Sequence, residues 1–247
     1  MSMALNRNLM RLLAGRAIAS TCRCLLVVAA MWSAAANAGP VSVSPLRLTL
    51  NPAAGIATLT VENTGTTEAL VQTEVLAWQQ PGGVPLLVPT DDVIAMPPVF
   101  KLAPGAKQRL RVGMTRPFDT AREQTFRLLV TEVPTTVAVP GSVAVAVRHS
   151  VPVFILPAVA VSANLVLRRT TTGGLEFANT GNRHLRVLRW RLRAGNGALL
   201  ADAQGPGYLL AGATQPVPLD SASLAPGESL MLEAETDTGP LRVPATR

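Results

Sequence analysis

Hydrophobic and polar residues alternate along most of the chain after residue 40. Residues 41–44, 57–61 and 71–75 are three such runs. A period of two places apolar side chains on one face of a β-strand and polar side chains on the other. No segment shows a long period of 3.6 residues with helix caps at both ends. The pattern therefore predicts an all-β fold.

Turn-forming residues separate these runs at intervals of about ten residues. They are Asn63-Thr64-Gly65, Pro81-Gly82-Gly83, Pro104-Gly105, Gly173-Gly174, Asn179-Thr180-Gly181 and Pro226-Gly227. This spacing is typical of immunoglobulin-like β-sandwiches, which need about 100 residues each. We therefore expect two sandwiches, residues 39–157 and 158–247, with a short hinge near Pro157, where a long strand-like run ends.

Two short segments of the first half recur in the second. Residues 62–65 (ENTG) resemble residues 178–181 (ANTG), and residues 102–106 (LAPGA) resemble residues 224–228 (LAPGE). Turns of similar chemistry arise independently, and they also arise when two domains are related. The sequence leaves both explanations open.

The first 38 residues have the composition of a secretory signal peptide. They contain four arginines and no acidic residue, then an apolar run from Cys24 to Trp32, then Ala36-Asn37-Ala38. A basic segment, a short apolar segment and an A-x-A site are the three parts of such a peptide. The apolar run is far shorter than the roughly 20 residues of a membrane-spanning helix. Both cysteines lie within residues 1–38, so the exported protein would fold without a disulfide.

Composition argues against several functions. Without residues 1–38, 18 basic residues (22 minus 4) face 15 acidic ones, an excess too small to indicate a nucleic-acid partner. Aromatic residues make up only 4%, and the chain has two histidines. We find no nucleophile elbow, phosphate loop or zinc-binding motif, and Asp91-Asp92 is not followed by a calcium loop. We therefore expect no enzyme activity, catalytic residue, metal, cofactor or small-molecule substrate.

Residues 143–156 (VAVAVRHSVPVFIL) form an unusually long strand-like run. Typical strands have about five or six residues. Val143, Val145 and Val147 share one face and alternate with alanines, and no charge precedes Arg148. Natural edge strands are commonly blunted by charges, proline or bulges. The run is therefore either a central core strand or a strand whose edge is left open for another chain.

Several sequence blocks resemble the periplasmic pilus-assembly chaperones of the chaperone–usher pathway. In the first half they are residues 43–48 (VSPLRL), 61–64 (VENT), 96–102 (MPPVFKL), 104–111 (PGAKQRLR), 126–134 (FRLLVTEVP) and 152–157 (PVFILP). The second half is similar mainly through residues 174–181 (GLEFANTG) and 207–212 (GYLLAG). Trp78, together with the absence of the family's lysine and interdomain aspartate, makes the chain similar to the archaic or spore-coat-like branch of these chaperones. The resemblance implies two immunoglobulin-like domains joined at an angle.

The resemblance also implies a function. Such a chaperone works in the periplasm, stabilises a pilus or fimbrial subunit by donating a strand to it, and delivers it to an outer-membrane usher. Here the donor residues would be Val143, Val145 and Val147. The free protein would cap its own open strand by self-association. The alternative is a secreted β-sandwich that serves as an adhesin or sugar-binding module.

Two groups of charged residues follow from the same resemblance. The family anchors the carboxylate of the subunit with an arginine and a lysine. Arg47 matches the arginine, but Pro152 occupies the lysine position, so Arg148 on the same strand face is the nearest replacement. Arg111 and Glu123 match a charge pair that links the two domains. The third member of that network, an aspartate, has no counterpart in residues 208–212.

Overall fold

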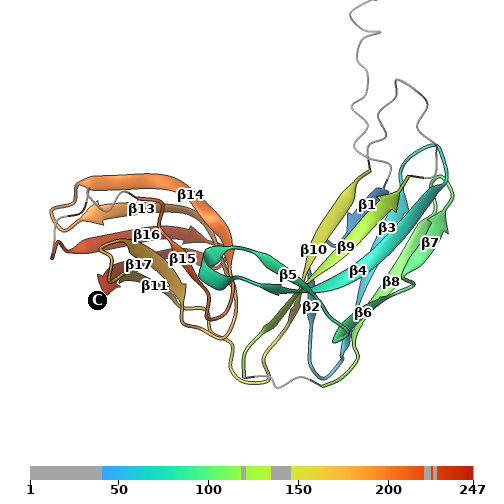
Figure 1. The fold of residues 1–247 in the computed structure, drawn as a ribbon, viewed down its shortest axis with the longest axis horizontal. Helices are drawn as coiled ribbons and strands as arrows, with labels where there is room; N and C mark the ends of the chain where they lie inside the picture. Colours follow the sequence, from blue (N-terminus) through green and yellow to red (C-terminus); the bar gives the residue numbers. More distant parts are fainter. Residues whose placement is uncertain (1–40, 118–120, 135–145, 220–223, 225–226, 247) are drawn as a thin grey trace, which may run out of the picture. The chain divides into compact units, whose positions relative to one another are not determined.

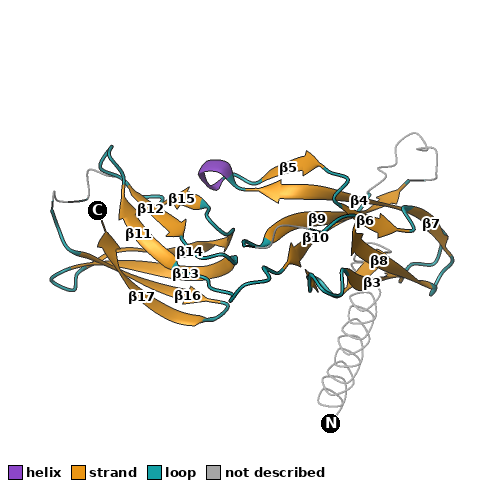
Figure 2. Cartoon of the chain, turned by 90° about the horizontal axis from the view of Figure 1, so that it is seen from below, coloured by secondary structure: helices purple, strands orange, loops and turns teal. Residues whose placement is uncertain are grey.

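The computed structural model of the chain describes residues 41–117, 121–134, 146–219, 224 and 227–246. The expected signal peptide and two of the three expected donor residues, Val143 and Val145, lie outside the described residues. The described part consists of strands joined by turns, and its one helical element is the 3-10 turn η1 (Pro81–Gly83), purple in Figure 2. The prediction of an all-β fold of two immunoglobulin-like sandwiches is confirmed.

Within the described residues, ten strands build the first sandwich and seven build the second. Figure 1 shows how these strands are arranged. The first ten are β1 (Val41–Ser44), β2 (Leu48–Leu50), β3 (Ile56–Asn63), β4 (Ala69–Gln79), β5 (Leu86–Pro89), β6 (Val93–Met96), β7 (Val99–Leu102), β8 (Lys107–Met114), β9 (Gln124–Val133) and β10 (Arg148–Ile155). The other seven are β11 (Leu165–Arg169), β12 (Leu175–Asn179), β13 (Leu185–Ala194), β14 (Leu199–Leu209), β15 (Thr214–Pro216), β16 (Leu230–Thr236) and β17 (Gly239–Thr246).

Two sheets form the first sandwich. One has the strand order β1-β3-β8-β6, and the other has the order β2-β10-β9-β4-β5, with β7 pairing β4. Their facing side chains make one apolar core, in which Leu59, Leu110, Leu128 and Val153 are fully buried. The alternation seen in the sequence thus corresponds to strands with one face in the core.

The second sandwich has its own core. Strands β14-β13-β16-β17 form one layer and β11-β12-β15 the other, and a parallel pairing of β17 with β11 joins the layers at one edge. Trp190, Phe177, Leu192 and Leu232 are buried between the layers. Since no disulfide is possible within the described residues, apolar burial is the main source of stability in both sandwiches.

The repeated Asn-Thr-Gly turns have the same geometry in both sandwiches. Asn63 and Asn179 are almost completely buried at the ends of β3 and β12. Each side-chain amide donates to the carbonyl four residues later, and each Oδ1 accepts from the glycine N–H two residues later. A second bond runs from Asn63 to Leu102 O and from Asn179 to Leu209 O. The two sandwiches therefore share a buried asparagine corner.

The structural counterpart of residues 102–106 in the second sandwich differs from the segment with the similar sequence, residues 224–228. In the first sandwich the backbone N–H of Gly105 donates to Asn63 O. In the second, the equivalent bond to Asn179 O comes from Gly212, not from Gly227. The likeness of residues 102–106 to residues 224–228 is therefore turn chemistry, and residues 209–213 occupy the equivalent place.

Candidate functional site

Strand β10 has a partner along its whole length on one side only. It pairs antiparallel with β9 from Arg148 to Ile155, whereas β2 pairs with it only from Val153 to Ile155. On the β2 side, the backbone of residues 148–152 has no strand partner among the described residues. An unpaired edge offers N–H and C=O groups to another strand.

The direction of these free backbone groups follows from the pairing. Glu132 N donates to Val147 O, while Leu156 N donates to Leu50 O. Because backbone groups of successive residues point to opposite edges, odd-numbered residues of β10 bond to β9 and even-numbered ones face the other side. The open edge therefore presents the backbone groups of Arg148 and Ser150. Pro152 lies at its end and has no N–H to offer.

The two expected anchor residues, Arg47 and Arg148, lie beside opposite ends of the open edge of β10. Since Leu48 is opposite Val153, Arg47 comes opposite Pro152, four residues from Arg148, or about 13 Å of extended strand. Arg47 Nη1 lies 4.0 Å from Asp237 Oδ2, and Arg148 Nε donates to Thr131 Oγ1 over 3.2 Å. The structure thus does not bring Arg47 and Arg148 together at one point.

A third arginine lies directly beside the missing lysine position. Arg127 of β9 is the cross-strand neighbour of Pro152, so both side chains are on the same face of the sheet. Its guanidinium carbon is 3.7 Å from the centroid of the Trp78 ring and 5.8 Å from that of Tyr208. Burial lowers the pKa of Arg127 below its usual value. Arg127 could not be predicted from the sequence, because its position beside Pro152 depends on the register between β9 and β10. The two residues are 25 positions apart in the chain.

An aromatic cluster joins the two sandwiches within the compact unit Gly39–Arg247. Trp78 and Phe154 come from the first sandwich, and Tyr208 and Leu210 from the second. The Trp78 and Tyr208 rings meet edge to face, with centroids 5.5 Å apart. Such a pair contributes about 0.5–1.5 kcal/mol beyond its buried area.

Buried polar groups surround this cluster. Gln80 Nε2 donates to Tyr208 O over 2.9 Å, and Gln80 Oε1 accepts from Leu210 N over 3.0 Å. Glu123 Oε2 accepts from both the backbone N–H and Nδ1 of His184, at 2.8 and 2.7 Å. We call Glu123 and His184 the carboxyl–imidazole latch. Both of its side chains are buried, and the imidazole stacks on Phe154 with centroids 3.7 Å apart.

The latch changes the interpretation of the expected Arg111–Glu123 pair. Glu123 does contact the second sandwich, but its partner there is His184. Arg111 lies on β8 in the other sheet, exposed, between Thr58 of β3 and Met96 of β6. No ion pair joins Arg111 to Glu123 among the described residues. The contact between the sandwiches thus uses an imidazole where the family pattern has a network of carboxylates and arginine.

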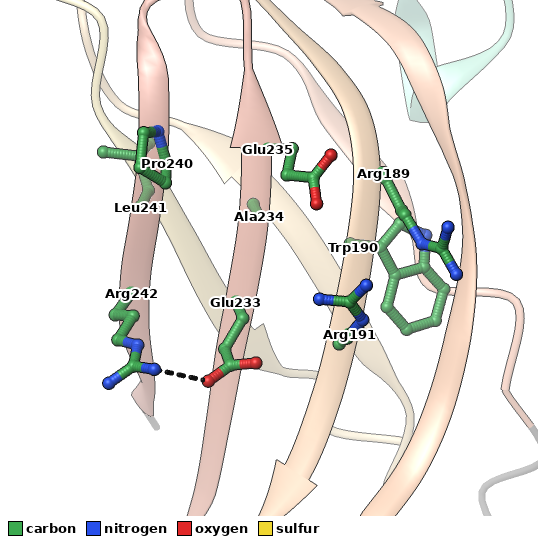
Figure 3. A pocket seen from close by; sticks show the side chains of 9 residues that line it. All are labelled: Arg189, Trp190, Arg191, Glu233, Ala234, Glu235, Pro240, Leu241 and Arg242. Atoms are coloured by element: carbon green, nitrogen blue, oxygen red, sulfur yellow. Dashed lines mark ion pairs between the residues drawn. The ribbon is translucent and has the colours of Figure 1, made fainter.

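A second charged surface lies on the outer face of the second sandwich. A cavity of about 170 Å³ lies there. Figure 3 shows that its lining includes arginines of β13 and β17 and glutamates of β16. Asp202 accepts hydrogen bonds from Arg189 and Arg191, and these guanidinium groups lower its pKa to about 2. Arg242 is paired with Glu233 at 3.0 Å. The charges of this surface are therefore largely neutralised by ion pairs within the chain.

The described residues contain no cluster of three or more histidine, cysteine or acidic side chains suited to a metal ion. Within the same residues, no helix is long and apolar enough to cross a membrane.

The described residues form two β-sandwiches, with one strand edge that has no partner among them and aromatic contacts at the junction of the two sandwiches. Residues 40–160 match the family described as "Pili and flagellar-assembly chaperone, PapD N-terminal domain". The first sandwich is therefore the N-terminal domain of this chaperone family. No curated protein matches the chain by sequence.

Solved structures share the fold. One is the CsuC–CsuE chaperone–tip adhesion subunit complex of the archaic Csu pili of Acinetobacter baumannii, with 23% identity, a TM-score of 0.56, and coverage of 73% of this chain and 90% of that chain. Another is the E. coli chaperone DraB, with 22% identity, a TM-score of 0.59, and coverage of 84% and 98%. A third is the Salmonella enterica SafA pilin–SafB chaperone complex, with 19% identity, a TM-score of 0.58, and coverage of 84% and 97%.

Proposed function

We propose that the protein is a periplasmic chaperone that binds a pilus or fimbrial subunit through the open edge of β10 and delivers it to an outer-membrane usher. The single observation that carries this proposal is the pairing of Arg148–Pro152 on one side only. The match of the first sandwich to the chaperone family supports it. Residues 1–38 would direct export to the periplasm, 39–157 would carry the donor strand, and 158–247 would form the second domain.

Strand addition explains how the edge would act. The subunit strand would pair with the backbone of β10 and with its extension toward residue 143. Val143, Val145 and Val147 would fill alternate pockets of the subunit. Burying one valine contributes about 1.5–3 kcal/mol, so three contribute roughly 5–9 kcal/mol before the cost of ordering. Arg47 and Arg148 would attract the carboxylate of the subunit, and free chaperone would cap the edge by self-association.

Refolding a denatured pilus subunit of the producing organism with the purified protein tests the proposal. We expect a soluble one-to-one complex in place of aggregated subunit. Val147→Lys should prevent capture, because a charge would enter an apolar pocket. Ala146→Lys is the matched control, since Ala146 is exposed and falls on the opposite strand face. Aggregation of every subunit at the same rate with and without the protein would refute the proposal and favour a free-standing adhesin or sugar-binding module.

Ser150→Pro probes the open edge directly. The Ser150 N–H faces the unpaired side of β10, so its removal costs the free protein no ladder hydrogen bond. We expect nearly unchanged stability but loss of subunit capture, whereas Ser150→Ala, which keeps the N–H, should behave as the original chain. Full capture by Ser150→Pro would show that the subunit does not pair with this edge.

A further inference from the structure

A cavity at the junction of the two sandwiches has positive charges in its wall and no negative ones. Arg127 of β9 and Arg186 of β13 border this space of about 300 Å³, and no acidic residue is among the residues that line it. The carboxylate of Asp237 accepts from the backbone N–H of Arg186 and lies 4.0 Å from Arg47, so it is engaged outside the cavity. Within the described residues, neither arginine of the cavity forms an ion pair.

Both guanidinium groups lie near aromatic rings. The guanidinium carbon of Arg127 is 3.7 Å from the centroid of the Trp78 ring and 5.8 Å from that of Tyr208. The guanidinium carbon of Arg186 is 5.6 Å from the same Tyr208 centroid. A ring attracts a cation, but it neither neutralises the charge nor occupies the N–H donors. Both arginines therefore keep donors for an anion in the cavity.

Other polar groups of the wall differ in whether they are satisfied. The amide of Gln80 bonds to Tyr208 O and Leu210 N. By contrast, the indole N–H of Trp78 is buried and has no acceptor, which is uncommon for a buried donor. Gln215 Oε1 also lacks a partner, but an amide can turn either its oxygen or its NH2 group toward a ligand. The unsatisfied groups are thus mainly donors.

The cavity is separate from the open strand edge. Its lining residues come from β4, β9, β13, β14, β15 and the hairpin that follows β4, and none of them belongs to β10. Neither Arg47 nor Arg148 is among them. A ligand of this cavity is therefore independent of a polypeptide that pairs with β10.

We propose that this cavity binds a small phosphate-class dianion between Arg127 and Arg186. One dianion neutralises both guanidinium charges, whereas one carboxylate would leave a partly buried charge uncompensated. A tetrahedral anion also offers different oxygens to two guanidinium groups that come from different sandwiches, and each planar group can donate two hydrogen bonds. The volume, at the lower end of the range of ligand pockets, leaves room for a small ester group.

Titration with inorganic phosphate, followed by NMR of the ¹⁵N-labelled protein, tests the proposal. Trp78 lines the cavity, whereas Trp190 is buried in the core of the second sandwich and serves as the internal control. We expect a saturable shift of the Trp78 indole N–H signal and none of the Trp190 signal. Acetate at the same ionic strength should bind at least about tenfold more weakly, because it compensates only one of the two charges.

The result that would overturn the proposal is equally specific. It is a Trp78 signal that does not saturate below about 10 mM phosphate, since such binding is no stronger than one hydrogen bond to a charged group. Acetate binding as tight as phosphate binding would also overturn it. The outcome does not depend on whether the protein captures a pilus subunit, because no residue of β10 takes part.

Arginine variants locate the bound anion. Arg127→Met and Arg186→Met should each weaken phosphate binding by about 10- to 100-fold, as expected for loss of charge-assisted hydrogen bonds. Arg127→Lys should recover part of the loss. Arg109→Met, at an exposed site of β8, is the matched control and should bind like the original chain. Since Arg186 is exposed, Arg186→Met should keep the original melting temperature, and unchanged affinity in both methionine variants would refute the site.

A second probe separates a free anion from a phosphate ester. Glycerol 3-phosphate carries the same dianionic group on a small neutral body. Tighter binding of this ester than of inorganic phosphate would support an ester as the ligand, because the rest of the cavity would then contribute. Tighter binding of inorganic phosphate would support the free anion. Failure of both probes to bind would overturn the proposal.

Discussion

The carboxyl–imidazole latch gives a sharp test of how the two sandwiches are held together. Replacing His184 with phenylalanine keeps a ring that can stack on Phe154 but removes the Nδ1 donor to Glu123. A hydrogen bond to a charged group contributes about 1.5–3 kcal/mol. Replacement with alanine also removes the stacking, which adds roughly 0.5–1.5 kcal/mol. We therefore expect His184→Ala to be more destabilising than His184→Phe.

For a chain of this size, 1 kcal/mol corresponds to about 2–4 °C in melting temperature. His184→Phe should therefore lower it by about 3–12 °C and His184→Ala by about 4–18 °C. Calorimetry should also show the two sandwiches melting separately once the latch is lost. In a double-mutant cycle, Glu123→Ala and His184→Phe should couple by about 0.5–3 kcal/mol.

The exposed pair between Arg116 and Asp92 provides the control, since ion pairs in full contact with solvent contribute little to stability. Asp92→Ala should leave the melting of both sandwiches coupled. If Glu123→Ala and His184→Phe were additive and each shifted the melting temperature no more than Asp92→Ala, the latch would contribute nothing to the junction.

Three further predictions concern stability. Asn179→Ala should lower the free energy of unfolding in urea by about 1–3 kcal/mol, because buried backbone groups lose their partner; a change below 0.5 kcal/mol, roughly the size of a surface substitution, would contradict this. Gly205→Ala should cost about 1–3 kcal/mol in the same assay, since its Cβ would overlap the Val187 carbonyl, and an unchanged midpoint would count against that geometry. The pKa of Asp202, measured by NMR, should lie near 2 and rise toward 3.8 in Arg189→Gln. Because folding lowers this pKa, the stabilisation is present above pH 4 and is lost as pH falls toward 2. An Asp202 pKa that is the same in Arg189→Gln as in the original chain would refute the assignment.

The strands could be predicted from the sequence because their signal is local. Alternation and turn residues lie within a few positions of one another, and they identified an all-β fold of two sandwiches. The long run at residues 143–156 illustrates where local information ends. Its later part is a core strand, with Val151, Val153 and Ile155 facing the core. Its edge nevertheless has no strand partner from Arg148 to Pro152 within the part of the chain that the structure describes, a property of the neighbouring strands that the run itself does not encode.

The residues missed at the domain junction share one cause. Arg127 became a candidate only through its cross-strand pairing with Pro152, and His184 only through its contact with Glu123, 61 positions away. Side-chain chemistry alone did not distinguish these residues from surface arginines and histidines. The signals available were weak: an arginine within an apolar strand, and a histidine three residues after the glycine of an Asn-Thr-Gly turn.

Pro152 is the last residue of the open edge of β10, and its cross-strand neighbour Arg127 contacts Trp78 at the junction of the two sandwiches. An open strand is an aggregation hazard, and a proline at its end limits how far a foreign strand can pair. A lysine at that position would provide an N–H and a charge at the same point. With proline there, the ladder of a foreign strand would stop one residue short of the first β10 residue that pairs with β2. Arg127 is on the adjacent strand in the same row, but its guanidinium carbon lies 3.7 Å from the centroid of the Trp78 ring of β4, on the side of β9 away from the open edge.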